Sequence, residues 1–307
     1  MKENLLLNQK IKEVIEKIHP KPNEISFAVI DLKINEPQVV GYNADRLIYP
    51  ASIYKVFVAA EILRQIDSGK RKLNDEIEIV SNDKIDGIRL FPKSARKDHR
   101  PLLEIGEKVT LDYLLDLMLT RSDNVASNLL LGIAGVENVN NNILFPNYWQ
   151  ETAVSSERLD QLKEKGDNRI SSITVSSARH LAELFYKIET GTLVNPRVSH
   201  KLKEYMTMGT KDRKGGLFLP DFKSYYQKGG SLKINGYRYN FLKSLVRLIL
   251  PKRYVITRYR GEAGVVQGKN SHYAIALLTQ VKTKWPWRKV DMKKLSQKIY
   301  EIMENNE

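Results

Sequence analysis

The order in which the hydrophobic period changes along the chain constrains its fold most. Apolar residues recur at helical spacing from Leu7 to Ile18 and predict an amphipathic helix that ends before His19-Pro20. The β-rich run from Ile25 to Leu32 and the QVVGYN segment that follows Glu36-Pro37 predict two paired strands. From Ala51 to about Ile66 the apolar pattern is helical again.

The rest of the chain changes from helical to extended and back to helical. Val109–Leu119 is apolar at helical spacing, the pattern continues after a break at Arg121–Asn124, and Leu181–Ile188 marks another helix. The strand-like segments SYYQKGG, AGVVQG and HYAIALLTQV follow, and a final helix starts at Asp291. This order predicts an α+β fold, in which N- and C-terminal helices flank an antiparallel sheet and an all-helical subdomain is inserted between the strands.

The same order predicts how the chain is divided. Residues 1–50 and 172–307 would form a discontinuous α/β subdomain, and residues 51–171 a helical subdomain, the two acting as one functional unit. Two polar stretches read as loops. One is Lys84–Arg100, and the other is Pro146–Ser172, which has the length of loops that are usually functional.

Composition excludes several classes of protein. With 307 residues, 42% of them apolar, the chain is neither disordered nor a disulfide scaffold, and no apolar run approaches the ~18 residues that span a bilayer. It has no cysteine, and its five histidines form no H-x-H or H-x-x-x-H pair, so we expect no metal and no organic cofactor. A net charge of +14 comes without a nucleic-acid-binding motif, so we expect no nucleic-acid partner.

The first chemical motif is Ser52-Ile53-Tyr54-Lys55, at the start of the second predicted helix. Residues three apart on a helix share a face, so the lysine amine can reach the serine hydroxyl and remove its proton. The helix N-terminus also offers backbone N–H groups to a developing oxyanion. By itself this pattern is also compatible with an ordinary surface pair.

The second motif, Ser122-Asp123-Asn124, lies in the break between two apolar helical segments. A second hydroxyl there can pass a proton to a leaving group, and the amide can hold both a substrate carbonyl and the lysine. The alternative interpretation is structural, with Ser122 as an N-cap and the other two residues in the first helical turn.

The third motif, Lys228-Gly229-Gly230-Ser231, ends a strand-like run. Glycines let a backbone approach a ligand closely, and an edge strand offers N–H and C=O groups to an extended substrate. The lysine could hold a substrate carboxylate. The alternative interpretation is a Gly-Gly turn after a strand.

Together, and in this order, the motifs resemble the S-x-x-K, S-D-N and K-T-G set of class A β-lactamases and penicillin-binding proteins. The resemblance extends from Ile25 to the final helix and implies the β-lactamase/transpeptidase-like fold. It implies Ser52 as the nucleophile, Lys55 as its base or proton relay, and Ser122 as the proton shuttle to the leaving nitrogen.

The resemblance also implies substrate-binding roles. Asn124 would position the substrate, Lys228 and Ser231 would bind its carboxylate, and Gly230 would belong to the strand that contacts it. The backbone N–H groups of Ser52 and Ser231 would form the oxyanion hole.

Deacylation separates the two groups of relatives, because class A β-lactamases carry a loop glutamate and an amide residue four positions later that hold the hydrolytic water. The Gly166–Arg169 stretch resembles the end of that loop, and counting back from it places Glu157 on the glutamate and Gln161 on the amide residue. Glu157 could instead be a solvated surface carboxylate. The expected function is a serine β-lactamase-like hydrolase; the alternatives are a penicillin-binding-protein-like D-Ala-D-Ala peptidase or transpeptidase, and a non-catalytic cell-wall-binding relative.

Three departures from the family pattern are expected to affect rate or substrate range. Gly229 replaces the usual hydroxyl residue. Ser155 and Ile170 stand where an Arg–Asp pair usually fixes the loop, so the loop should be more mobile or held differently. The arginine often found on the next strand aligns near Ala263, so Arg258 or Arg260 would have to replace it.

An insertion follows Ser231. Between Lys233 and Arg260 there are eight basic residues and no acidic one. We favour a solvated flap at the edge of the site, and the alternative is a weak contact with an anionic surface. By resemblance we expect a monomer that acts on a β-lactam or a peptidoglycan peptide and is periplasmic or secreted, although no signal peptide is visible.

Overall fold

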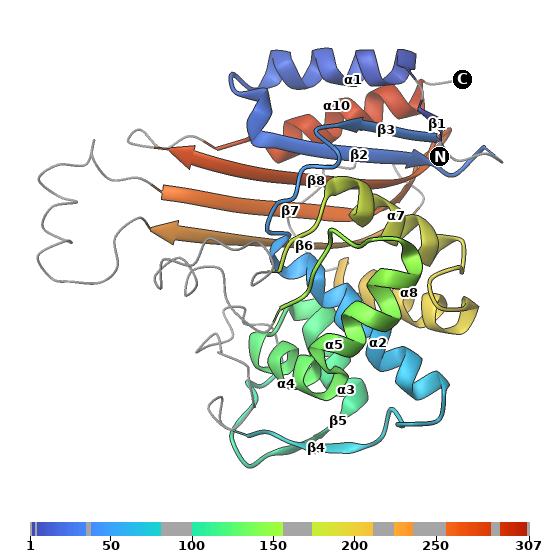
Figure 1. Cartoon of the computed structure of the whole chain (residues 1–307), viewed down its shortest axis with the longest axis vertical. Coiled ribbons are helices and arrows are strands. Elements are labelled where there is room, and N and C mark those ends of the chain that lie inside the picture. Colours follow the sequence, from blue (N-terminus) through green and yellow to red (C-terminus); the bar gives the residue numbers. More distant parts are fainter. Residues whose placement is uncertain are drawn as a thin grey trace, which may run out of the picture.

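The dominant element of the fold is a mixed six-stranded sheet with the order β1-β3-β2-β8-β7-β6 (Figure 1). The computed structural model describes residues 2–3, 5–34, 38–80, 100–155, 174–210, 224–235, 256–283 and 289–305. Neighbouring strands are antiparallel, except that the two-residue β1 runs parallel to β3. The strands are β1 (Lys2–Glu3), β2 (Ile25–Asp31), β3 (Gln38–Tyr42), β6 (Ser224–Asn235), β7 (Ile256–Gln267) and β8 (His272–Thr283).

Strand β2 lies between β3 and β8, so a strand from the start of the chain pairs with one from its end. All seven residues of β2 are buried. Phe27 and Val29 belong to the core on one face of the sheet, and Ala28 and Ile30 to the core on the other. A strand covered on both faces needs no polar alternation, which explains the continuous apolar run in this segment.

The two terminal helices cover one face of the sheet, as predicted (Figure 1). Helix α1 (Leu5–Ile18) buries Leu7, Ile11 and Ile15, and α10 (Met292–Glu304) buries its own apolar stripe. These side chains share one core with Phe27 and Val29 of β2. The fold therefore matches the α+β architecture expected from the sequence.

The opposite face carries the helical part of the chain (Figure 1). Helix α2 (Lys55–Asp67) is buried almost all round, with Val56, Phe57 and Val58 fully inaccessible, because other helices surround it. The remaining helical segments are η1 (Pro22–Glu24), η2 (Ala51–Tyr54), α3 (Leu111–Asp116), η4 (Leu117–Arg121), α4 (Asn124–Ala134), α5 (Val136–Val139), η5 (Asn140–Leu144), η6 (Phe145–Asn147), α7 (Ala178–Glu189) and α8 (Pro196–Thr210).

Two parts of the fold differ from the prediction. Helix α8 was not predicted, although Asn195 caps it, Pro196 begins it, and Val198, Leu202 and Met206 are buried at helical spacing. The segment predicted as one helix over Val109–Leu119 instead starts in β5 (Lys108–Thr110), which pairs with β4 (Glu76–Glu78), and ends in a π-helical turn. The pairing with β4 is a tertiary contact that overrides the local helical pattern.

Parts of three predictions lie outside the described residues: most of the Lys84–Arg100 loop, part of the Pro146–Ser172 loop, and most of the basic insertion. The division into two subdomains stays a prediction. Within the described ranges, no helix is both long and apolar enough to cross a membrane.

Candidate active site

Residues from all three motifs line one cavity between the edge strand β6 and the helical part of the chain. Its volume is about 170 Å³. The lining residues are Tyr49, Ala51, Ser52, Tyr54, Lys55, Ser122, Asn124, Gly229, Gly230, Ser231 and Leu232. The geometry therefore brings side chains and backbone from three distant stretches of sequence to a single place.

Ser52 lies in a 3₁₀ turn, η2, that continues directly into α2. Ala51 just before it has φ 52°, a left-handed conformation that costs about 1–2 kcal/mol for a residue with a Cβ atom. Such strain persists only where the surroundings fix the backbone, and it is common at functional sites. The Ser52 side chain is partly exposed to the cavity.

Strand β6 presses its backbone against this turn at Gly230. A Cβ atom at Gly230 would lie 2.5 Å from the Ser52 backbone nitrogen and 2.9 Å from its Cβ atom. Only glycine permits this approach, which places the Ser52 N–H beside the backbone that leads to Ser231. Two N–H groups at such a junction can stabilise an oxyanion.

Lys55 connects the first motif to the second. Its side chain is only 1% exposed, and Nζ donates hydrogen bonds to the Ser122 carbonyl oxygen at 2.9 Å and to Ser122 Oγ at 3.2 Å. Nζ also donates to Asn124 Oδ1 at 3.0 Å. Because the amide oxygen of Asn124 accepts from Lys55, its NH₂ group is the part that can donate to a substrate carbonyl.

The second motif has a strained conformation of its own. Ser122 has φ 60°, and Asp123, not Ser122, is the N-cap of α4, because its Oδ1 accepts from the Ala126 N–H at 3.1 Å. The alternative interpretation of Ser122 as the cap is therefore wrong. The left-handed turn leaves the Ser122 hydroxyl on the cavity, within hydrogen-bond distance of Lys55.

Arg121 stabilises this turn through an ion pair and hydrogen bonds. It is buried, and its guanidinium forms an ion pair with Asp123 Oδ2 at 3.1 Å. It also donates to the carbonyl oxygens of Arg100 and Pro101, each at 3.1 Å. Breaking a buried pair of this kind costs several kcal/mol, so Arg121 fixes the loop that carries Ser122 and Asn124.

Two tyrosines form part of the cavity wall. Burial raises the pKa of Tyr54 to about 12, so it is a neutral phenol across the physiological pH range. Tyr49 packs edge-to-face against Tyr259 of β7, with ring centroids 5.8 Å apart. The rings of Tyr49 and Tyr54 contribute apolar surface to this wall of the cavity.

The third motif lies on β6, which is an edge strand of the described sheet. In the described sheet β6 pairs with β7 on one side only, so its other edge faces the cavity. Ser231 is exposed there, whereas Lys228 is fully buried and is not among the residues that line the cavity. A direct contact between Lys228 and a substrate stays a prediction.

Glu262 accounts for the glycine at position 229. Gly229 pairs with Glu262 across β6 and β7, and a Cβ atom at Gly229 would lie 1.8 Å from Glu262 Oε2. A side chain at position 229 would therefore require this carboxylate, which is nearly buried and lies 3.7 Å from the Arg260 guanidinium, to move. Sequence analysis did not single out Glu262, because the register that brings it beside Gly229 is a tertiary feature.

The strand register also places the two candidate arginines and Ala263 on opposite faces of the sheet. Ala263 pairs with Lys228, whereas Arg260 pairs with Ser231 and Arg258 with Lys233. Because paired residues of neighbouring strands point to the same face, both arginines share a face with Ser231, and Ala263 points to the other one. Either arginine can therefore approach a group bound at Ser231.

The base of the long loop is held by hydrogen bonds between its two ends. The Ser155 N–H donates to Thr174 Oγ1 at 3.0 Å, and Ala153 forms a β-bridge with Val175. Ser155 is one of the two positions at which the family pattern has an Arg–Asp pair, and the other, Ile170, lies outside the described residues. Glu157, Gln161 and the Gly166–Arg169 stretch lie outside the described residues, so their assignments stay predictions.

The sequence analysis missed several residues of this site. Tyr54 could have been found from its place inside the first motif and Arg121 from its place beside the second. For Tyr49 and Glu262 no local signal exists, since each reaches the site only through the packing of the sheet against α2 and its preceding turn.

Comparison with known proteins agrees with this fold. The model of the β-lactamase enzyme family matches residues 6–303, and the chain therefore belongs to the β-lactamase enzyme family. It is 27% identical over 176 residues to a β-lactamase of Rhodobacter capsulatus, covering 55% of this chain and 53% of that protein. It is 24% identical over 206 residues to a β-lactamase of Streptomyces albus G, covering 63% and 60%. The chain thus spans between half and two thirds of the length of these two relatives.

Solved structures share the fold over nearly the whole chain. The extended-spectrum β-lactamase TLA-1 superposes with a TM-score of 0.69 at 16% identity, covering 97% of this chain and 99% of that one. The protein PBP-A gives a TM-score of 0.62 at 17% identity, covering 99% and 97%. At such identities the likeness shows the α+β β-lactamase/transpeptidase fold alone.

Proposed function

We propose that this protein is a serine hydrolase that opens β-lactams by acylation of Ser52 and then hydrolyses the acyl-enzyme. The observation that carries the proposal is the convergence of Ser52, the Lys55–Ser122–Asn124 hydrogen-bond cluster and the β6 backbone on one cavity. A nucleophile, a proton acceptor and oxyanion donors are the three parts that acyl transfer needs.

In the acylation step, Ser52 Oγ attacks the lactam carbonyl carbon and its proton passes to Lys55, directly or through Ser122. The carbonyl oxygen becomes an oxyanion, held by the Ser52 and Ser231 N–H groups. When the intermediate collapses, the C–N bond breaks and Ser122 Oγ delivers a proton to the departing nitrogen. Ser122 suits this role because its hydroxyl lies 3.2 Å from Lys55 Nζ, which can restore the proton.

In the proposed binding mode, the substrate lies along the free edge of β6 and its carboxylate sits near Ser231 and Lys228. With Gly229 in place of a hydroxyl residue, this contact depends on Ser231 and on Arg260, the residue paired with it. Glu262 on the same face restricts how close a carboxylate can come to Gly229.

In the deacylation step, Glu157 would take a proton from a water molecule placed with the help of Gln161. The water oxygen would attack the ester carbonyl, and Ser52 would leave with its proton restored. The hydrogen bonds between Ser155 and Thr174 join the two described residues that flank the segment carrying Glu157 and Gln161.

A second candidate function is that of a penicillin-binding-protein-like peptidase or transpeptidase. It is favoured by the structural likeness to PBP-A and by the missing Arg–Asp pair of the loop. Such a protein would be acylated at Ser52 by the same route but would deacylate slowly or transfer the acyl group to an amine.

One experiment tests the proposal. The protein is mixed with a chromogenic cephalosporin, and both turnover and intact mass are followed, with Ser52→Ala as the control that cannot be acylated. We expect sustained turnover, and in Glu157→Ala we expect loss of turnover with accumulation of a stable adduct on Ser52. A stoichiometric adduct without turnover in the unaltered protein supports the second candidate. If the protein forms no adduct and shows no turnover, it is a non-catalytic wall-binding protein.

A further inference from the structure

A second and larger cavity lies beside the candidate active site, on the face of the sheet that carries the terminal helices. Its volume is about 440 Å³. It shares Gly230, Ser231 and Leu232 with the cavity of Ser52, so the two cavities adjoin at the edge strand β6. The remaining lining residues come from β6, β7, β8 and the approach to α10: Lys233, Arg258, Tyr259, Arg260, Glu262, Thr279, Val281, Lys289 and Val290.

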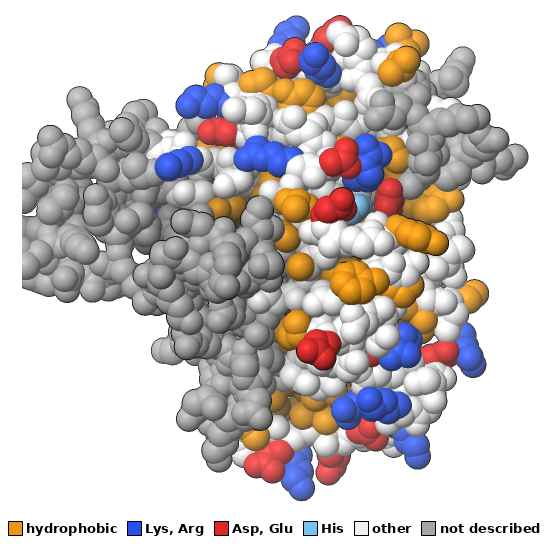
Figure 2. All heavy atoms as spheres, viewed as in Figure 1, with side chains coloured by type: hydrophobic (Ala, Val, Ile, Leu, Met, Phe, Trp, Pro, Cys, Tyr) orange, Lys and Arg blue, Asp and Glu red, His pale blue; other side chains and the backbone are white. Residues whose placement is uncertain are grey.

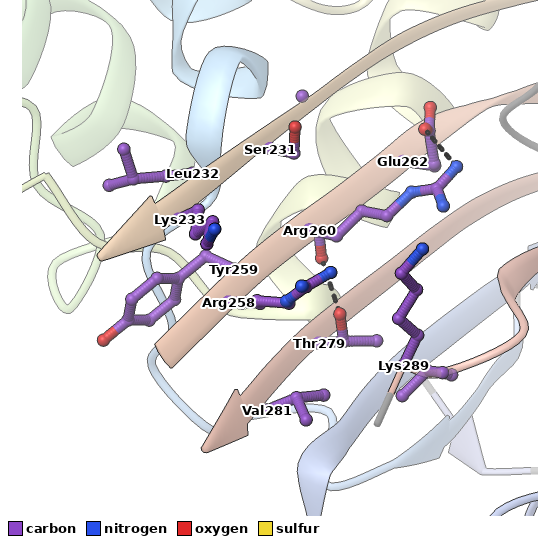
Figure 3. A pocket seen from close by; sticks show the side chains of 12 residues that line it. Ser231, Leu232, Lys233, Arg258, Tyr259, Arg260, Glu262, Thr279, Val281 and Lys289 are labelled. Carbon is purple, nitrogen blue, oxygen red and sulfur yellow. Dashed lines mark hydrogen bonds and ion pairs between the residues drawn. The ribbon is translucent and has the colours of Figure 1, made fainter. Parts of the chain in front are cut away.

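The charges of this cavity are strongly one-sided. Four basic side chains and one carboxylate line it, a formal excess of three positive charges. Figure 3 shows the side chains of Arg258, Arg260 and Lys289 over β7 and β8, and the ion pair between Arg260 and Glu262. By contrast, the described surface in Figure 2 has basic and acidic side chains interspersed.

The strand register increases this concentration of charge. Lys233 and Arg258 pair directly across β6 and β7, and Arg258 and Arg260 point to the same face two residues apart. Like charges in these positions repel each other and destabilise a sheet. The opposing residues on β8 are Val281 and Thr279, which carry no charge.

Acidic residues are sparse in the sequence around the cavity, where Glu262 lines it and Asp291 follows Val290. The segment from Lys233 to Arg260 contains no Asp or Glu, and neither does the segment from Thr279 to Val290. Clustered cationic side chains raise the local concentration of anions, so an excess of three positive charges around one cavity favours a ligand of opposite charge. Guanidinium groups in particular match the oxygens of carboxylate and phosphate groups in pairs.

We propose that this cavity is a subsite for a second anionic group of the substrate, with at least two negative charges, beyond the carboxylate expected at Ser231. The assignment to the substrate rests on the proposed function, whereas the preference for anions rests on the residues that line the cavity. The shared lining residues Ser231 and Leu232 place this cavity next to a ligand bound at Ser52. A volume of about 440 Å³ has room for a group the size of a diphosphate or dicarboxylate.

Binding is tested without catalysis by titrating Ser52→Ala protein with inorganic pyrophosphate in a calorimeter. We expect saturable binding of one pyrophosphate, weakened by salt, and at least about tenfold weaker in a variant that also carries Lys233→Gln and Lys289→Gln. The matched control is Lys70→Gln, which removes an exposed charge in the turn after α2. Absence of saturable binding, or equal affinities in the double variant and the control, overturns the proposal.

The link to the substrate is tested with two cephalosporins that differ only in a neutral or a dianionic C3 substituent. We expect the Lys233→Gln/Lys289→Gln double variant to acylate more slowly with the dianionic compound at limiting substrate. The fold-reduction in the acylation rate constant should be at least about ten times larger for the dianionic compound than for the neutral one. An equal reduction for both compounds contradicts the subsite. If neither compound acylates Ser52, the proposed function fails and the pyrophosphate titration still decides whether the cavity binds anions.

A lipid headgroup is the other source of the same chemistry. Sedimentation with vesicles of phosphatidylglycerol, compared with phosphatidylcholine, separates the two sources. We expect no difference between the vesicles. Selective binding to the anionic vesicles that the double variant loses would assign the cavity to the membrane surface and overturn its assignment to the substrate.

Discussion

At the scale of single residues, the site depends on close backbone approaches that only particular side chains permit. Gly230 lets β6 touch the turn of Ser52, and Gly229 leaves room for the Glu262 carboxylate. Ala51 and Ser122 both have left-handed backbones although neither is glycine. These positions share a cause, because the packing around the cavity fixes the backbone more tightly than local preference does.

Replacement of Gly230 by alanine is predicted to slow acylation strongly. The new Cβ atom would meet backbone and Cβ atoms of Ser52 at 2.5 and 2.9 Å, and neither can swing aside. We expect a stability loss of about 1–3 kcal/mol from overpacking and at least a hundredfold slower acylation, since β6 must move away from Ser52. Intact mass spectrometry after mixing with a β-lactam measures the rate, and urea denaturation measures the stability.

The matched control is Gly69→Ala. Gly69 has φ +76° and open space around it, so alanine there costs about 1–2 kcal/mol through backbone strain alone. Acylation should be unaffected in this control. Equal rates in the two variants would show that the contact between Gly230 and Ser52 is unimportant for the reaction.

At the scale of secondary-structure elements, Glu189 joins four of them at the end of α7. Its carboxylate receives Lys203 Nζ of α8 at 2.9 Å and the Tyr226 hydroxyl of β6 at 2.9 Å, and His272 Nε2 of β8 lies 3.2 Å away. Burial by itself would raise the pKa of Glu189, but the interactions with His272, Lys203 and Tyr226 outweigh it and lower the pKa to about 2. The strand that carries Lys228 and Ser231 is thereby tied to both helices.

Glu189→Gln is predicted to destabilise the fold in a pH-dependent way. A carboxyl group whose pKa is lower in the folded state stabilises it above the unfolded pKa of about 4.5, and this contribution is lost as the pH falls towards 2. We expect the variant to lose about 2–3 kcal/mol of unfolding free energy at pH 7 and much less at pH 3, measured by urea denaturation. The control is Glu78→Gln, which changes an exposed carboxylate and should leave stability unchanged at both pH 7 and pH 3. An equal loss of stability at the two pH values for Glu189→Gln would contradict the charge-based explanation.

At the scale of the whole molecule, the sheet separates two hydrophobic cores, and only one of them contains the elements that carry Ser52 and Lys55. One lies between the sheet and the terminal helices, and the other joins the sheet to the helical part that carries Ser52 and Lys55. Strand β2 contributes to both, because alternate side chains point to opposite faces. The terminal helices therefore support the site through the sheet, without touching the cavity of Ser52.

Ile15→Ala in α1 is predicted to lower stability while leaving the chemistry intact. Ile15 is fully buried, so its truncation should cost about 2–5 kcal/mol of unfolding free energy. Acylation of the folded protein at low temperature should stay within about twofold of the unaltered rate, because the change is confined to the core on the far face. Leu6→Ala, at a position 69% exposed, is the control and should change neither quantity. A large fall in acylation for Ile15→Ala at temperatures where it is folded would show that the far core shapes the site.

Local sequence was sufficient to predict the main elements of the fold. The helical stripes of α1 and α10, the continuous apolar run of β2 and the three short motifs each carry their signal within a few neighbouring residues. The helix α8 had such a signal in Asn195, Pro196 and its apolar spacing, and it was overlooked. The π-helical turn before Ser122 had none, because it results from the contacts that fix Arg121.

The sequence by itself determined the class of fold, through its order of hydrophobic periods, and named the residues that could perform acyl transfer. Only the tertiary structure decided that Lys55 contacts Ser122 and Asn124, that β6 touches Ser52 at Gly230, and that Glu262 lies beside Gly229. It also gathered Lys233, Arg258, Arg260 and Lys289 into one cavity. The physical reason is that periodicity reports which face of an element is buried, whereas strand register and the packing of helices on a sheet decide which distant side chains meet there.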